Sequence, residues 1–286
     1  MQKWEMRVRL TTQLKKRLKE PGLIMAPGVA DALNALLVAE AGFEAIYMTG
    51  AGTTACRLGM PDVGLLTVTE MADNAGRIAD ASGLPLISDA DTGYGSPVNV
   101  FRTVSLFEKA GASGIHIEDQ HWPKRCGHLS GKTIIPAAEM VAKIHAACDA
   151  RKDEDFVIIA RTDALATNGL EAALERAELY QEAGADVIFV ESPRTQDEIK
   201  AIPKKVSVPL LFNMAASGKT PFLSREEIEN YGYKIAIYPN FAILSALPAV
   251  RNYLSQLRQT GSVSHMLNDM ASFQDLFNLL GMDNIK

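Results

Sequence analysis

Short apolar runs recur along the chain, and each run ends in a polar or glycine-containing stretch. Eight runs of four or five residues predict buried strands, at residues 23–26, 45–48, 84–88, 114–117, 156–160, 186–190, 209–212 and 234–237. The intervals between most of these runs are long enough for a helix. The hydrophobic pattern therefore predicts a chain in which strands and helices alternate.

The segments between the runs show helical spacing of apolar residues. In the first predicted helix, Leu10, Leu14 and Leu18 share one face. Thr67 and Glu70 have the spacing of a capping box, which predicts the start of a helix before the third strand. Further helices are predicted, so that the set covers residues 7–20, 31–41, 136–150, 169–183, 224–230 and 240–259.

A helix–glycine–strand unit recurs at Gly42, Gly111 and Gly184. Eight strands, nearly all followed by a helix, fit a (β/α)8 barrel of the TIM type, which needs about 250 residues. Since no linker divides the chain, residues 1–286 are predicted to form one barrel domain, with about 240–286 as a C-terminal helical extension. A doubly wound α/β sheet is the alternative, but its Gly-x-Gly-x-x-Gly motif does not follow an early strand.

Composition narrows the class of protein. The chain is 47% hydrophobic and 22% charged, as soluble globular proteins are. A net charge of −5 without a dense Lys/Arg cluster argues against nucleic acid as a partner. Apolar runs stay shorter than the roughly 18 residues of a membrane span, and the first 20 residues are charged, unlike a signal peptide. Cys56, Cys126 and Cys148 form no Cys-x-x-Cys pair, which favours a reducing cytoplasm.

The third predicted strand ends in two carboxylates, Asp89 and Asp91, followed by a glycine-rich loop. Residues two apart on a strand point to the same side, and like charges so close repel each other unless a cation lies between them. Oxygen ligands with little nitrogen or sulfur nearby favour Mg²⁺ or Mn²⁺ over zinc. The alternative is an Asp-rich turn that merely closes the strand.

Polar residues also follow the other predicted strands. In a barrel, catalytic groups gather at the carboxyl ends of the strands. Asp163 is expected to serve mainly as a helix N-cap, but Glu, Arg and similar residues cap poorly, so capping does not explain the whole set. The polar strand ends are Thr49–Gly50, Asp89 and Asp91, Glu118–Asp119, Arg161–Asp163, Glu191, Asn213 and Tyr238.

The loop after the fourth predicted strand is long, as binding loops and lids are. In it, Cys126 is surrounded by Lys124, Arg125 and His128, and such an electropositive setting lowers a thiol pKa. We therefore predict a catalytic role for Cys126. By contrast, Cys56 and Cys148 are expected to be inert buried residues.

Four motifs in combination resemble the isocitrate lyase/phosphoenolpyruvate mutase superfamily. They are Leu58-Gly-Met-Pro-Asp62, Asp89-Ala-Asp-Thr-Gly93, Lys124-Arg-Cys-Gly-His128 and Ala160-Arg-Thr-Asp163. The resemblance spans about residues 27–281. It implies an α/β barrel with Mg²⁺ at the strand ends and a mobile gating loop that carries the cysteine. It also implies a C-terminal helix exchanged within dimers, which usually pair into homotetramers.

The resemblance further implies roles for individual residues. Asp89 and Asp91 would hold Mg²⁺ directly or through water, with Asp62 and Glu118 farther out. Substrate binding would fall to Thr49, Gly50, Ala51, Gly127, Arg161, Glu191 and Asn213. The catalytic set would be Cys126, Lys124, His128, Arg161 and Tyr47, the last matching a tyrosine proposed as base in some members. The family has a glutamate where this chain has Ala216, so the identity of the base stays open.

The chemistry implied is cleavage of the C2–C3 bond of a 2-hydroxydicarboxylate. A base takes the hydroxyl proton, an α-keto acid leaves, and Cys126 protonates the remaining enolate-type carboxylate as general acid. Closure of the loop would keep water from the carbanion. The cysteine favours a carbon–carbon lyase over the phosphonate mutase and decarboxylase branches, whose gating loops lack it.

Within the lyases, the resemblance is to the group of 2,3-dimethylmalate lyase, petal death protein and 2-methylisocitrate lyase. Leu244 and Phe273 stand where the 2-methylisocitrate lyases have arginines for a third carboxylate. Loss of one such contact costs roughly 2–5 kcal/mol, so a smaller, alkylated dicarboxylate is favoured. The segments beginning at Trp122, Asn213 and Gly218 also match the first two of these enzymes.

The sequence thus predicts a Mg²⁺-dependent lyase for alkylmalates such as 2,3-dimethylmalate, which yields pyruvate and a carboxylic acid. Hydrolysis of oxaloacetate to oxalate and acetate is the first alternative, and cleavage of 2-methylisocitrate to pyruvate and succinate is the second. A non-catalytic barrel is the alternative from a different class, because fold does not fix function.

Overall fold

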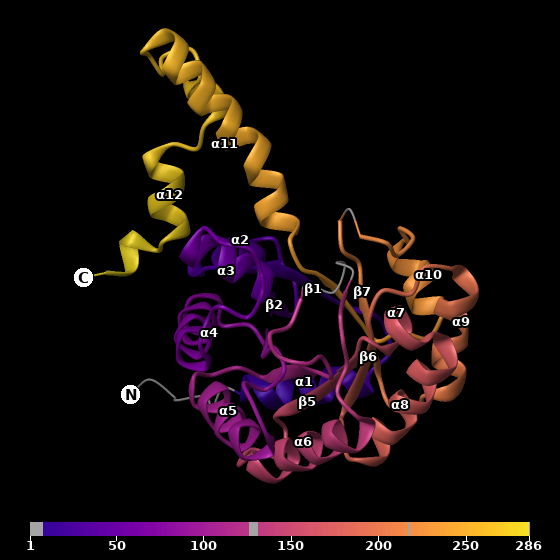
Figure 1. Cartoon of the computed structure of the whole chain (residues 1–286). Coiled ribbons are helices and arrows are strands. Elements are labelled where there is room, and N and C mark those ends of the chain that lie inside the picture. Colours follow the sequence, from indigo (N-terminus) through magenta and orange to yellow (C-terminus); the bar gives the residue numbers. More distant parts are fainter. Residues whose placement is uncertain (1–7, 126–130, 217, 286) are drawn as a thin grey trace, which may run out of the picture.

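The eight predicted runs form eight parallel strands that close into a barrel (Figure 1). The computed structural model describes residues 8–125, 131–216 and 218–285. Strand β1 pairs with β2 through Gly28 and Tyr47 and with β8 through Ile24 and Ile235, which closes the barrel. The strands are β1 (Ile24–Val29), β2 (Ile46–Met48), β3 (Leu86–Asp89), β4 (Gly114–Glu118), β5 (Val157–Thr162), β6 (Val187–Val190), β7 (Leu210–Asn213) and β8 (Ile235–Tyr238). The predicted barrel is confirmed.

Helices surround the barrel, and every predicted helix is present within three residues of its predicted ends. The capping box of Thr67 and Glu70 is formed, and Gly42 follows its helix with a positive φ of 78°. The helices are α1 (Leu10–Lys19), α2 (Ala32–Glu40), α3 (Gly50–Leu58), α4 (Val68–Ser82), α5 (Pro97–Lys109), α6 (Ala137–Ala150), α7 (Ala164–Asn168), α8 (Leu170–Glu182), α9 (Gln196–Lys205), α10 (Arg225–Asn230), α11 (Phe241–Thr260) and α12 (Phe273–Leu279), with 3₁₀ turns η1 (Leu267–Asp269) and η2 (Met282–Asn284).

Some helices, among them α3, α7 and α9, lie outside the ranges predicted from the pattern. Helix α3 follows β2 directly and carries Gly50 and Gly52 in its first turn. Glycine is a poor helix former, so local propensity argues against a helix there. The helix forms because the Thr49 side chain caps it, accepting a hydrogen bond from Gly52 N. Its N-terminus consequently lies at the carboxyl end of the barrel.

The barrel interior is filled by alternate strand residues such as Ile24, Tyr47 and Phe189. Leu14 and Leu18 of α1 belong to the same apolar cluster, so α1 closes the end of the barrel opposite the strand carboxyl ends (Figure 1). A second, larger cluster lies between the strands and the outer helices. Among the described residues, no helix combines the length and hydrophobicity needed to cross a bilayer.

The chain leaves the barrel after β8. Helix α11 projects away from the barrel, and the following segment returns so that α12 contacts α2 (Figure 1). None of the 20 residues of α11 is buried. Leu247, Val250 and Leu254 are among the apolar side chains that it exposes. A helix that would normally cover β8 and β1 therefore leaves that part of the barrel uncovered.

Candidate active site

The carboxyl ends of the strands enclose a small polar cavity of about 50 Å³. Five of the seven predicted polar strand ends contribute a side chain to its lining, and these residues, from Asp89 to Asn213, are up to 124 positions apart in the sequence. The lining residues are Tyr47, Ala51, Asp62, Asp89, Glu118, Lys124, Arg161, Phe189, Glu191, Asn213, Ala215, Ile237, Pro239 and Asn240. The structure therefore brings together residues that the sequence indicated separately.

Asp89 and Asp91 lie at the end of β3 in an unusual local conformation. Asp91 N donates to Asp89 Oδ1 at 2.9 Å, and Gly50 N donates to Asp89 Oδ2 at 3.2 Å. Asp91 has a φ of 47°, which non-glycine residues rarely adopt, and Glu118 N donates to its carbonyl oxygen at 2.9 Å. Backbone contacts from α3 and β4 thus hold both carboxylates in place.

Lys124 places its ammonium group among these carboxylates. Its Nζ lies 2.6 Å from Asp62 Oδ1 and 2.8 Å from Asp91 Oδ1. Burial alone would lower the pKa of Lys124, but the surrounding carboxylates, Asp91 foremost, hold it well above its usual value. Burial raises the pKa of Asp91 to about 6, against the opposing effect of Lys124. The lysine is therefore charged and counterbalances the acidic cluster.

The acidic cluster offers hard oxygen donors for a metal ion. Within residues 8–125, 131–216 and 218–285, no three acidic, histidine or cysteine side chains converge closely enough to hold an ion by themselves. Even so, Glu118 Oε1 is a buried oxygen without a hydrogen-bond partner, and buried carboxylates normally have one. This donor set suits Mg²⁺ or Mn²⁺ bound partly through water. A cation here would compete with Lys124.

Arg161 is the buried cation on the opposite side of the cavity. It donates through Nε to Asp163 Oδ2 at 2.9 Å, and its Nη1 lies 3.2 Å from Glu118 Oε2. Its Nη2 lies 3.9 Å from Glu191 Oε1, and its guanidinium stacks over Phe189. The site therefore presents a positive group to a carboxylate ligand close to the acidic cluster.

The prediction that Asp163 is mainly an N-cap is wrong. It stands at the N-cap position of α7, but its side chain makes no capping hydrogen bond. Its carboxylate instead binds Arg161 and, at 2.6 Å, Lys132 Nζ. Burial would raise the pKa of Asp163, but these two cations lower it to about 2. Two buried cations compete for this carboxylate more strongly than the neutral amides at the start of the helix do.

Asp119 supports the site from behind. Its carboxylate accepts hydrogen bonds from Asp163 N at 2.9 Å, Thr162 Oγ1 at 2.8 Å, Tyr180 OH at 2.8 Å and Arg176 Nη1 at 3.0 Å. These donors come from β5 and α8. Asp119 therefore fixes the backbone that carries Arg161 and Asp163.

Tyr47 points into the barrel and hydrogen-bonds to a histidine. Its OH lies 2.8 Å from His116 Nε2, which itself lies 3.5 Å from Asp89 Oδ1. Burial, with Asp89 adding to it, raises the pKa of Tyr47 well above 10. Burial also lowers the pKa of His116 to about 4, so the imidazole is neutral near pH 7. His116 was not predicted, although it alternates with Glu118 on β4 and so faces the same side.

The remaining predicted binding residues lie at three strand ends. Thr49, Gly50 and Ala51 form the start of α3, whose backbone N–H groups and helix dipole favour anions. On the far side, Asn213 Nδ2 donates to both carboxylate oxygens of Glu191, at 3.3 and 3.2 Å. Asn213 Oδ1 is buried without a hydrogen-bond partner. The site thus has hydrogen-bonding groups on both flanks of the acidic cluster.

Comparison with known proteins gives the family. The model of the phosphoenolpyruvate phosphomutase family matches residues 14–258. The chain is 44% identical to 2,3-dimethylmalate lyase of Eubacterium barkeri over 274 residues, 96% of this chain and 95% of that one. It is 42% identical to a 2-methylisocitrate lyase of Aeropyrum pernix, covering 94% and 86% of the two chains.

The chain belongs to the isocitrate lyase/phosphoenolpyruvate mutase superfamily. This confirms the family resemblance. It also confirms the prediction that the chain is a lyase of this superfamily.

Solved structures of superfamily members agree. A crystal structure of 2,3-dimethylmalate lyase superposes with a TM-score of 0.92 at 40% identity, covering 96% of this chain and 93% of the other. Oxaloacetate acetylhydrolase with 3,3-difluorooxalacetate gives 0.91 at 39% identity, covering 96% and 94%. Phosphonopyruvate hydrolase with oxalate and Mg²⁺ gives 0.89 at 33% identity, covering 97% of each chain. Magnesium therefore belongs to the chemistry of this superfamily.

The cysteine predictions have mixed outcomes. Cys126, Gly127 and His128 lie outside the described residues, so their predicted roles stay predictions. The expectation that Cys56 is buried is wrong, because it is exposed on α3. Cys148 is only half-buried, and its thiol donates to Gly184 O at 3.3 Å. Hydrophobicity predicted burial, but Cys56 is exposed and Cys148 packs only against the edge of the core.

We predict that Asp119→Ala destabilises the protein markedly. The substitution leaves Arg176 and three other donors without their buried acceptor, and breaking such a network costs roughly 3–5 kcal/mol. The free energy of unfolding is to be measured by urea denaturation. Asp73→Ala is the control, since Asp73 is an exposed carboxylate that also pairs with arginines, Arg57 and Arg77. An equal, small effect of both substitutions would contradict the supporting role of Asp119.

Proposed function

We propose that this chain is a Mg²⁺-dependent carbon–carbon lyase that cleaves alkylmalates such as 2,3-dimethylmalate to pyruvate and a carboxylic acid. One observation carries the proposal: four carboxylates, Asp62, Asp89, Asp91 and Glu118, lie in one small buried site beside the cationic Arg161. A 2-hydroxydicarboxylate would use both features: the carboxylates would hold a metal ion for its hydroxyl end, and the arginine would bind its free carboxylate.

The acidic cluster would serve as the metal site. Asp89 and Asp91 would hold Mg²⁺ directly or through water, with Asp62 and Glu118 contacting its water ligands. When bound, the ion supplies Lewis-acid polarisation of the substrate hydroxyl and its neighbouring carboxylate. The unpartnered oxygen Oε1 of Glu118 supports this assignment.

The groups around the cluster would orient the substrate. Arg161 and the N-terminus of α3 at Gly50 and Ala51 would bind the carboxylates, and Asn213 would hydrogen-bond to an oxygen at the far side. A base takes the hydroxyl proton, the C2–C3 electron pair moves to C3, and the Cys126 thiol gives its proton to C3. Tyr47, which the resemblance suggested as base, lines the cavity with its hydroxyl on the neutral His116, but its raised pKa keeps that hydroxyl protonated, so the identity of the base stays open.

Lys124 would act as the closing element of the site. The lysine is only 3% exposed and lines the cavity, held between Asp62 and Asp91. A dicarboxylate would reach the acidic cluster when the segment that carries Lys124 moves away. Its return would exclude water from the carbanion during cleavage.

The proposal also specifies the size of the substrate, a dicarboxylate rather than a tricarboxylate. Leu244 lies one turn after Asn240, which lines the cavity, and it offers an apolar side chain in place of an arginine. Phe273, on α12, does the same at the second position. The similarity to 2,3-dimethylmalate lyase supports an alkylmalate, whereas the similarity to oxaloacetate acetylhydrolase makes oxaloacetate hydrolysis the second candidate.

Comparison of three substrates tests the proposal. Pyruvate release from 2,3-dimethylmalate should depend on Mg²⁺, with a kcat/KM at least about tenfold above that for 2-methylisocitrate, because one misfit group changes the ratio by at least that factor. Oxalate release from oxaloacetate is measured beside it. Preference for the tricarboxylate would contradict the reading of Leu244 and Phe273, and preference for oxaloacetate would establish the second candidate.

The role of the thiol is tested by Cys126→Ser. A serine hydroxyl is a far weaker acid, so turnover should fall by at least about 100-fold, the lower range for general acid catalysis. Mg²⁺ affinity, measured by calorimetry, should remain unchanged. Cys56→Ser is the control for thiol loss elsewhere. Turnover by Cys126→Ser within a few-fold of wild type would refute the acid role.

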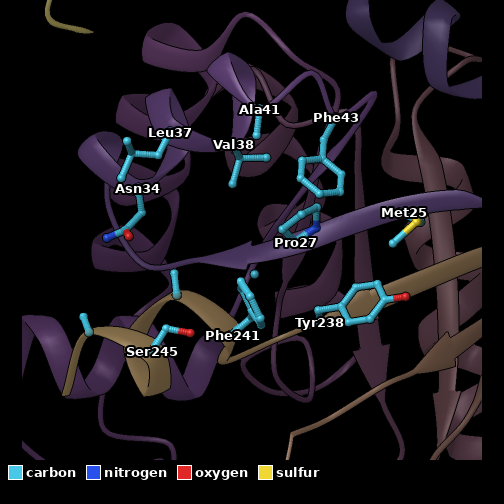
Figure 2. Close-up of a pocket in the computed structure, with 13 residues that line it drawn as sticks. Met25, Pro27, Asn34, Leu37, Val38, Ala41, Phe43, Tyr238, Phe241 and Ser245 are labelled. Atoms are coloured by element: carbon cyan, nitrogen blue, oxygen red, sulfur yellow. The ribbon is translucent and has the colours of Figure 1, made fainter. Parts of the chain in front are cut away.

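We also propose that two copies of the chain exchange their C-terminal helices. An apolar groove of about 580 Å³ lies between α2 and the start of α11, where Met25, Val38, Phe43 and Tyr238 point into it (Figure 2). The exposed apolar face of α11 cannot fill the groove of its own chain, because the helix projects away (Figure 1). A second copy offers a matching helix, and a two-fold axis buries both faces. Pairs of such dimers would give a homotetramer.

Sedimentation analysis checks this assembly. The wild-type chain should sediment as a dimer or tetramer, and Leu254→Glu should shift it towards monomer, since it places a charge on the exposed apolar face of α11. Arg251→Glu, an exposed change on the same helix, should leave the assembly intact. A monomeric wild-type protein would contradict the exchange.

A further inference from the structure

Lys132 is a buried lysine at the edge of the site that the sequence did not single out. Its Nζ lies 2.6 Å from Asp163 Oδ1, and the two side chains are only 2% and 0% exposed. A buried lysine is costly unless an anion accompanies it, so the pair marks a position where the fold requires a charge. The proposed reaction does not use this lysine.

The position of Lys132 in the chain connects it with the loop after β4. That loop begins and ends in a short antiparallel stem, in which His121 N donates to Thr133 O at 2.8 Å and Ile135 N donates to Asp119 O at 2.9 Å. Lys124 lies at the start of the loop and Lys132 at its end. Each end of the loop thus places a lysine on a carboxylate of the site.

Asp163 joins this lysine to the arginine of the site. Its Oδ1 lies 2.6 Å from Lys132 Nζ and also accepts from Arg161 Nη2 at 3.2 Å, while Oδ2 accepts from Arg161 Nε at 2.9 Å. Arg161 faces Glu118 and Glu191 as well. With three carboxylates around one guanidinium, a ligand carboxylate must compete with them for Arg161. Lys132 reduces that competition because it offsets the charge of Asp163.

We propose that Lys132 is a positioning residue: it holds Asp163 and thereby keeps Arg161 available to the substrate carboxylate, so that the end of the loop and the carboxylate-binding arginine are coupled. This rests on the proposed function, in which Arg161 binds the substrate. Without Lys132, the uncompensated carboxylate of Asp163 draws the guanidinium to itself. Substrate binding is then weakened more than the chemical step.

Lys132→Met tests the proposal with Lys15→Met as matched control. Lys15 also pairs with a partly buried aspartate, Asp186, but at the opposite end of the barrel. Lys132→Met should raise KM for the best substrate by roughly 10–100-fold, the range for residues that orient a binding group, with kcat within about threefold. Lys15→Met should leave both unchanged. Loss of kcat at constant KM in Lys132→Met would overturn the proposal.

A second variant separates positioning from a purely structural role. In Lys132→Met/Asp163→Asn, the carboxylate that would trap Arg161 is neutral, so KM should return to within a few-fold of Asp163→Asn alone. Independent, multiplying effects of the two substitutions would refute the coupling. The thermal midpoint of each variant is recorded, since lost stability without this rescue would indicate only a structural ion pair.

Calorimetric titration with oxalate in the presence of Mg²⁺ keeps this test separate from the proposed reaction. If wild type binds oxalate but turns over none of the three substrates, the lyase proposal fails while the positioning role stays measurable. Oxalate affinity should then fall in Lys132→Met and recover in the double variant. Equal oxalate affinity of wild type and Lys132→Met would overturn the role of Lys132 whatever the substrate.

Discussion

The structure depends on balancing charges that are buried at one end of the barrel. An isolated buried charge costs several kcal/mol, so such groups occur only with partners. Here carboxylates outnumber cations, and burial raises the pKa of Asp91 to about 6 and that of Glu118 well above its usual range. The carboxylates are Asp62, Asp89, Asp91, Glu118, Asp119, Asp163 and Glu191, and the cations are Lys124, Lys132, Arg161 and Arg176. A bound divalent cation would neutralise part of this excess negative charge.

The same balance links the loops to the barrel. Lys124 binds Asp62 of the segment after α3 as well as Asp91, which follows β3, so two loops close over the site together. Gly64 has a φ of 74°, and a Cβ there would lie 2.5 Å from the Trp122 ring. Glycine thus lets the two loops pack face to face. The loop after β4 therefore both supplies a lysine that neutralises buried carboxylates and covers the site.

Much of this arrangement could be predicted from the sequence, for physical reasons. Apolar runs and helix spacing determine where strands and helices form, and parallel strands bring Asp89, Glu118, Arg161 and Glu191 to the same end. The two-residue spacing of Asp89 and Asp91 indicated a shared side by strand alternation, but Asp91 lies beyond the end of β3 with a φ of 47°, and backbone hydrogen bonds hold it instead. Local pattern could not show α3, because its glycines argue against a helix until Thr49 caps it.

The partners of buried charges were harder to predict. Asp163 matched an N-cap by residue type, but its partner Lys132 lies 31 positions earlier, at the end of a loop. No local signal connects two such residues, because the contact depends on the closed barrel and on the stem of that loop. The C-terminal extension shows the same limit: its apolar face is visible in the sequence, whereas the groove that would receive it forms only in the folded barrel.

The most direct test of the central claim is calorimetric titration with Mg²⁺ in the absence of substrate. If the excess of carboxylates forms a cation site, one Mg²⁺ should bind per chain, and Asp91→Asn should weaken binding by at least about tenfold. Asp73→Asn, an exposed change, should bind as wild type does. Absence of saturable binding, or equal binding by wild type and Asp91→Asn, would contradict the account.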